Sequence, residues 1–122
     1  MGEIYQSIVL VGKRDLRVNA FLDSGASTTY INDNLMDKLG YSRIKREYVE
    51  LGNGKRIVGY KTSIIMKVKG RVKSAIAVAI KMPEQLIIGH NFFQDNDVIL
   101  DYSKDKFRFS KRIPMANRRL RL

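Results

Sequence analysis

The sequence predicts an all-β fold, a small and mostly antiparallel barrel or sandwich of roughly seven or eight short strands with one or two short helices. Two patterns indicate strands: apolar and polar residues alternate over 63–69 and 71–81, and the short apolar run 86–88 is typical of a fully buried strand. Turn residues recur about every eight to twelve positions, as in small barrels and sandwiches. The chain of 122 residues is long enough for one core and too short for two.

Elements in the first part of the chain follow from local signals. Residues 4–11 and 16–22 are rich in aliphatic side chains and predict the two strands of a hairpin. Residues 28–31 then lead into a short helix, for which Asn32 is a suitable N-cap. Gly40 suits the C-terminal end of that helix.

A projecting hairpin is predicted over residues 43–61. Its turn, Gly52-Asn53-Gly54, is the strongest hairpin signal in the chain, and 55–61 forms the returning strand. Because the flanks are basic and carry few apolar residues, we expect the hairpin to stand away from the core. Tyr48 and Tyr60 are interpreted as an aromatic pair across its two strands, although contact with a substrate is the alternative.

The second half of the chain predicts more short strands. After 63–69, 71–81 and 86–88, a helical turn follows with Phe92 and Phe93 as core residues. The last strands are expected at 98–100 and 107–109. We therefore divide the chain into a domain over 1–110 and a basic C-terminal tail over 111–122, predicted to be partly disordered.

Composition excludes several kinds of site. The chain has no cysteine and a single histidine, so disulfides, thiolate chemistry and a two-histidine zinc motif from one chain are excluded, and no cofactor or metal is expected. The net charge of +11 permits weak attraction to nucleic acid or anionic surfaces, chiefly through the basic tail. No apolar run approaches the roughly 20 residues of a membrane span. No signal peptide is visible, so a cytoplasmic protein, or a soluble domain of a larger one, is expected.

The segment that carries chemistry is the turn after the second strand. Asp23 follows the apolar residues Phe21 and Leu22, so its carboxylate lies at the end of a buried strand and must be hydrogen-bonded, paired or used. Ser24 supplies a hydroxyl that donates and accepts, and Gly25 permits close approach of another backbone. The same composition is also common in ordinary turns.

Three features in a fixed order resemble the retropepsin-like aspartic proteases, the single-domain relatives of pepsin. An apolar strand ends in Asp23-Ser24-Gly25-Ala26, a glycine-tipped hairpin follows about thirty residues later at 52–54, and the buried run 86–89 precedes His90. The resemblance covers roughly residues 4–109. It implies one lobe of a pepsin-like fold, a closed or partly open β-barrel.

The resemblance assigns roles in the turn after the second strand. Asp23 matches the catalytic aspartate, and Ser24 matches the hydroxyl residue that braces the two active-site loops of a dimer. Gly25 matches the glycine whose carbonyl faces the substrate backbone, and Ala26 completes the signature.

Roles outside this turn follow in the same way. Gly52, Asn53 and Gly54 match the tip of the flap, and Ile88 with Gly89 matches the apolar-glycine element beneath the catalytic loop.

Two positions depart from the family pattern. Retroviral enzymes usually carry an Asp after the Ala and an Arg after the later Gly, and the two often form an ion pair. Here these positions hold Ser27 and His90, so both charges are missing together. A neutral hydrogen bond between the two side chains is the expected replacement.

The resemblance implies an aspartic endopeptidase that works as a homodimer on an extended peptide. Two carboxylates must share one proton, and this chain contains one Asp-Ser-Gly signature. Leu22, Ile57 and Ile80 are candidate apolar walls of the cleft. The alternatives are a non-catalytic dimerisation or peptide-binding module on the same fold, and a nucleic-acid-binding β-barrel. Aromatic residues do not cluster with basic ones in the sequence as such barrels require.

Overall fold

A long antiparallel hairpin opens the computed structural model, which describes residues 4–96, 98–101 and 106–109. β1 (Ile4–Val11) pairs with β2 (Asp15–Leu22) along their full lengths, and Ile4 lies opposite Leu22. Alternate residues of both strands are buried, so the hairpin presents one face to the core, as predicted. Leu22 is buried in the core, so the strand ends inside the protein immediately before Asp23.

The main sheet is mostly antiparallel, as predicted, and two of its pairings are parallel. β3 (Thr29–Asn32) pairs in parallel with β6 (Arg71–Ile80) and antiparallel with β7 (Leu86–Ile88), while β7 pairs in parallel with β2. Residues 28–31 lead into a helix, as predicted, but the strand β3 within this segment was not predicted. β3 has four residues and no hairpin turn to either partner, so only tertiary pairing defines it.

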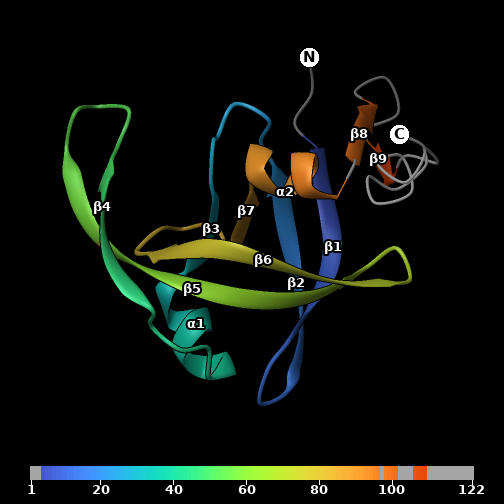
Figure 1. Cartoon of the computed structure of the whole chain (residues 1–122), viewed down its shortest axis with the longest axis horizontal. Helices are drawn as coiled ribbons and strands as arrows, with labels where there is room; N and C mark the ends of the chain where they lie inside the picture. Colours follow the sequence, from blue (N-terminus) through green and yellow to red (C-terminus); the bar gives the residue numbers. More distant parts are fainter. Residues whose placement is uncertain (1–3, 97, 102–105, 110–122) are drawn as a thin grey trace, which may run out of the picture.

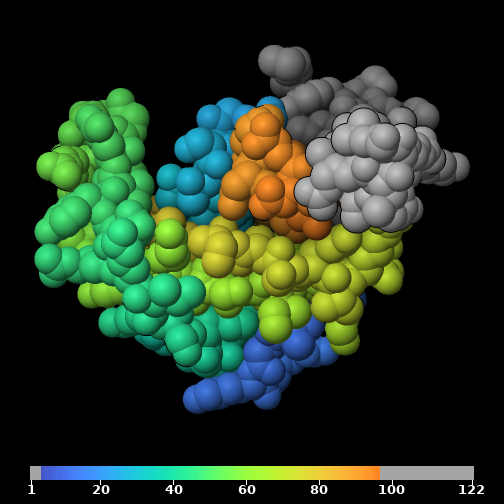
Figure 2. Space-filling model, viewed as in Figure 1, coloured from blue at the N-terminus to red at the C-terminus, as the bar shows by residue number. Residues whose placement is uncertain are grey.

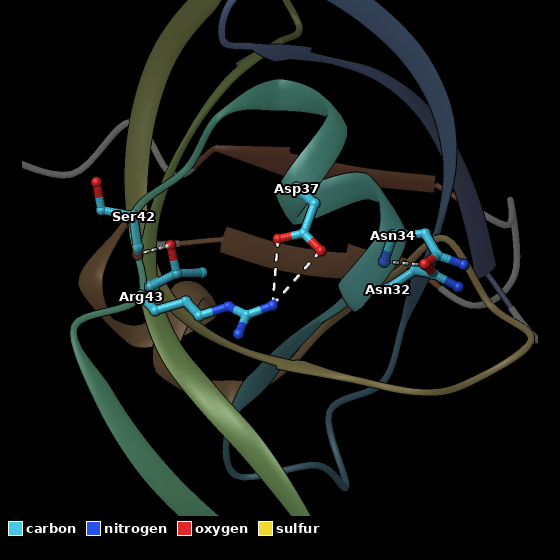
Figure 3. Close-up of polar contacts among 6 residues, drawn as sticks. Asn32, Asn34, Asp37, Ser42 and Arg43 are labelled. Carbon is cyan, nitrogen blue, oxygen red and sulfur yellow. Dashed lines mark hydrogen bonds and ion pairs between the residues drawn. The ribbon is translucent and has the colours of Figure 1, made fainter.

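The first helix, α1 (Asp33–Leu39), has the predicted ends. The side chain of Asn32 accepts a hydrogen bond from the backbone N–H of Asn34 at 2.9 Å, which makes it the N-cap (Figure 3). Gly40 ends the helix with a φ of 77°, a left-handed conformation that glycine adopts without strain. Arg43 lies 3.4 Å from the Asp37 carboxylate, in an exposed ion pair on the same segment (Figure 3).

One continuous strand closes the barrel. β5 (Arg56–Val68) has 13 residues and merges the two strands predicted over 55–61 and 63–69. It pairs with β6 along most of its length and with β1 through Leu10 and Met66. The order β1-β2-β7-β3-β6-β5 therefore returns to β1, giving a closed six-stranded barrel, and β4 (Lys45–Glu50) lies outside the ring (Figure 1).

Aliphatic side chains from all six barrel strands fill the interior. Met36 and Leu39 of α1 and Phe92 and Phe93 of α2 (His90–Asp95) complete it, and Figure 1 shows the two helices on opposite sides of β5 and β6. The prediction that both phenylalanines are core residues is confirmed, since they are 1% and 7% exposed.

A second, two-stranded sheet ends the described chain. β8 (Val98–Asp101) and β9 (Lys106–Phe109) pair antiparallel, close to the positions predicted for the last strands. The predicted tail over 111–122 lies outside the described residues. Within the described ranges, no helix is long and apolar enough to cross a membrane.

Tyr41 joins the end of α1 to the barrel, and its phenol makes the free energy of unfolding fall as the pH becomes alkaline. Its hydroxyl lies 2.8 Å from the carbonyl of Val11 and 3.1 Å from that of Ile65. Burial raises the pKa of this phenol above its ordinary value. Its contribution to stability is therefore complete below the unfolded-state pKa, and it disappears as the pH rises through the higher folded-state pKa.

Tyr41→Phe should lower the free energy of unfolding by about 1 kcal/mol at neutral pH, because the single O–H that the Val11 and Ile65 carbonyls share is lost. The loss of stability at alkaline pH should also become shallower. Urea denaturation at neutral and alkaline pH measures both effects. Tyr30→Phe is the control, since the Tyr30 hydroxyl makes no hydrogen bond within the described part of the chain. Equal pH profiles for the wild type and Tyr41→Phe would contradict the assignment.

Candidate active site

Asp23 lies in a tight loop at the carboxyl end of β2. Its backbone N–H donates to the carbonyl of Ile88 at 2.9 Å, which fixes the loop to β7. The loop also closes on itself: the Gly25 N–H donates to Asp23 Oδ1 at 3.0 Å, and the Ala26 N–H donates to the Asp23 carbonyl at 3.1 Å. The carboxylate is half-buried and held in one orientation, while Ser24 and Gly25 are exposed.

The start of α2 packs directly beneath this loop. The backbone N–H of His90 donates to the Ala26 carbonyl at 2.7 Å. A Cβ atom placed on Gly89 would lie 2.2 Å from the carbonyl oxygen of Thr28, so only glycine fits between the two backbones. Ile88, Gly89 and His90 thus all contact the loop through their main chain.

The expected hydrogen bond between the Ser27 and His90 side chains is absent from the described residues. Both side chains are exposed, and the contact between the two segments is made by the backbone. The prediction was wrong because the close packing at Gly89 brings main-chain groups together and leaves both side chains outside.

A buried hydroxyl network, which sequence reasoning missed, braces the loop from the other side. Thr29 is completely buried, and its Oγ1 donates to Asn91 Oδ1 at 2.8 Å and accepts from the Gly89 N–H at 3.1 Å. Asn91 Nδ2 in turn donates to the carbonyl of Ile76 at 3.1 Å. Thr29 and Asn91 are far apart in sequence and each is an ordinary polar residue, so no sequence signal marks them.

Thr29→Val should lower the free energy of unfolding by about 1–3 kcal/mol, because the buried N–H of Gly89 loses its acceptor while the shape of the side chain is kept. Thr29→Ser keeps the hydroxyl and is the matched control. Urea denaturation distinguishes the two, and an equal loss from both variants would assign the effect to the Thr29 methyl group instead.

The β4–β5 hairpin stands beside the loop that contains Asp23. Figure 1 shows it projecting from the barrel, and Figure 2 shows an open notch between it and that loop. At the tip, the Leu51 N–H donates to the Lys55 carbonyl at 2.7 Å, and Asn53 Oδ1 accepts from the Lys55 N–H at 3.0 Å. Gly54 has a φ of 84°, and Gly52, Asn53 and Gly54 are all exposed.

The two faces of the hairpin differ in burial. Val49 and Ile57 are opposite each other in the register and half-buried, on the same face as Gly59. A Cβ atom on Gly59 would touch the side chains of Val78 and Ile80, so this face turns toward the end of β6.

The three candidate wall residues fall into two groups. Leu22 and Ile80 are 3% and 6% exposed and belong to the core, whereas Ile57 is half-exposed on the hairpin. The described residues contain no group of three side chains able to hold a metal ion.

A closed six-stranded barrel with an Asp-Ser-Gly loop at one end and a glycine-tipped hairpin beside it is the retropepsin-like arrangement. A family model described as "gag-polyprotein putative aspartyl protease" matches residues 10–95, more than half of the chain. The chain belongs to this family of retropepsin-like aspartic proteases. No curated protein matches the sequence.

Solved structures show the same fold at low sequence identity. The retroviral protease-like domain of Ddi1 from Leishmania major is 16% identical, with a TM-score of 0.65, and the match covers 93% of this chain and 96% of that one. The protease of equine infectious anaemia virus, solved with the inhibitor HBY-793, is 22% identical with a TM-score of 0.60, covering 77% and 88%. The simian foamy virus (mac) protease is 18% identical with a TM-score of 0.53, covering 73% and 92%.

Proposed function

We propose that this chain is an aspartic endopeptidase that acts as a homodimer, with one Asp23 from each subunit. The observation that carries the proposal is the loop geometry: the Asp23 carboxylate is fixed by the Gly25 N–H at the end of the barrel, and the loop is tied to β7 and α2. A carboxylate held this way is preorganised for acid–base chemistry.

The reaction needs two such carboxylates about 3 Å apart. The ionised one accepts a proton from water as the water attacks the scissile carbonyl, and the protonated one donates to the carbonyl oxygen. Because the sequence contains one Asp-Ser-Gly signature, the second carboxylate comes from a second copy related by a two-fold axis. Ser24 is the residue proposed to brace the two loops.

The hairpin is the proposed flap. Its half-buried face, with Val49 and Ile57, offers apolar contacts to a peptide, and Gly52, Asn53 and Gly54 place little side-chain bulk at the tip. A substrate bound as an extended strand would be held mainly through its backbone, which suits an unfolded protein or a flexible segment. Closure of the flap would exclude bulk water.

Cleavage of a denatured, unstructured protein between about pH 3 and pH 7 tests the proposal. Products should appear with micromolar protein, pepstatin should block them, and the specific activity should fall on dilution below the dimer dissociation constant. A specific activity independent of dilution would contradict the dimer. A folded dimer that binds peptide without cleaving it would instead identify a non-catalytic peptide-binding module.

A further inference from the structure

Arginine side chains gather around two tyrosine rings on the β4–β5 hairpin. Tyr48 lies between two guanidinium groups, with Arg46 5.6 Å and Arg56 5.2 Å from the ring centroid. Arg46 Nη2 also donates to the Tyr48 hydroxyl at 3.2 Å. Nearer the barrel, the guanidinium of Arg43 lies 4.5 Å from the ring of Tyr60.

These contacts replace the aromatic pair predicted from the sequence. Tyr48 lies opposite Val58, and Tyr60 lies opposite Arg46, so the two tyrosines are offset by two positions along the hairpin and do not face each other. The sequence prediction assumed that they face each other, and the registration at the hairpin tip separates them. Basic and aromatic side chains therefore do interleave on one face, contrary to the conclusion drawn from the sequence alone.

This face, formed by Arg46, Tyr48, Glu50, Arg56 and Val58, is open to solvent and carries a net positive charge. Tyr48 is 57% and Val58 45% exposed, and both arginines are exposed. No ion pair within the described residues involves Arg46 or Arg56. Glu50, opposite Arg56 in the register, is the acidic residue of the face, and the two make no ion pair there.

We propose that this face binds single-stranded nucleic acid. Exposed guanidiniums contact successive phosphates, and an exposed ring between them offers a surface on which a base stacks. An acidic peptide would contact only the arginines, whereas a base would also cover the exposed part of the Tyr48 ring, which is 57% exposed, so the aromatic ring favours nucleic acid. The proposal is independent of proteolysis, because Val49 and Ile57 lie on the opposite face of the same hairpin.

The charge component is tested by fluorescence anisotropy of the full chain with a labelled oligo(dT) of about 20 nucleotides over a range of salt concentrations. Arg46→Gln/Arg56→Gln should weaken binding and reduce the salt slope by roughly 1.4, the value for two lost phosphate contacts on a single strand. Lys13→Gln/Arg14→Gln is the matched control, since it removes the same charge from the exposed β1–β2 turn. The basic tail is present in every variant.

An equal effect of the two double variants would overturn the proposal in favour of general electrostatic attraction, as would the absence of binding by the wild type at low salt.

The stacking component is tested separately. Tyr48→Leu should weaken oligo(dT) binding about tenfold and leave heparin binding unchanged, while Tyr48→Phe should bind oligo(dT) nearly as the wild type does. Unchanged oligo(dT) affinity in Tyr48→Leu, or competition by poly-glutamate as strong as by unlabelled oligo(dT), would identify an acidic protein surface as the partner instead.

Discussion

Asp23→Asn should greatly slow peptide-bond hydrolysis without unfolding the protein. The Asn side-chain oxygen still accepts from the Gly25 N–H, so the loop keeps its main contacts. The amide neither takes a proton from water nor donates one as a carboxylic acid does, and loss of acid–base catalysis lowers rates by about 10²- to 10⁴-fold. Activity on a denatured protein and a urea denaturation curve measure the two properties. Asp95→Asn, at an exposed position of α2, is the charge-matched control.

Mixing the wild type with Asp23→Asn tests whether the second carboxylate comes from a second subunit. If both carboxylates are needed and subunits exchange, an equal mixture should keep about one quarter of the activity of the same total amount of wild type, since only dimers of two wild-type chains are active. A monomeric enzyme would keep about half, because each wild-type chain acts alone. Retention of half the activity after subunit exchange would therefore contradict the shared site.

Local signals predicted the parts of this fold that depend on local chemistry. The β1–β2 hairpin follows from two runs rich in aliphatic residues, and α1 follows from the N-cap residue Asn32 and the terminating glycine Gly40. β3 was missed because four residues between a loop and a helix carry too little pattern, and its partners, β6 and β7, are distant in sequence. The parallel pairs were missed for the same reason, because parallel strands are not joined by a hairpin turn that could be recognised in the sequence.

The candidate site shows the same division. The Asp23 signature and the glycine-tipped hairpin could be predicted because each is a short stretch with its own turn chemistry. The Thr29–Asn91 network could not, because it depends on two residues that only the finished barrel brings within hydrogen-bonding distance. The arginines around Tyr48 were missed because their contacts with the ring depend on which residues lie opposite one another in the folded hairpin.

Gly89→Ala should be the most destabilising single-methyl change in this site. The added Cβ would lie 2.2 Å from the Thr28 carbonyl oxygen and 2.5 Å from its carbon, and these backbone atoms cannot move aside as a flexible side chain can. Either β7 or the Asp23 loop must shift, which would stretch the 2.7 Å hydrogen bond from His90 to Ala26. The expected cost is about 3 kcal/mol of unfolding free energy, at the upper end for overpacking.

Gly52→Ala is the control, because a Cβ at this position of the hairpin tip meets no atom within 4 Å. Its unfolding free energy should stay within about 0.5 kcal/mol of the wild type. Urea denaturation compares the two variants, and equal midpoints would show that the loop yields to Gly89→Ala at little cost. Proteolysis adds a second readout: if the loop shifts, Gly89→Ala should lose activity even where it is still folded, because the Asp23 carboxylate no longer sits where a second one can share its proton.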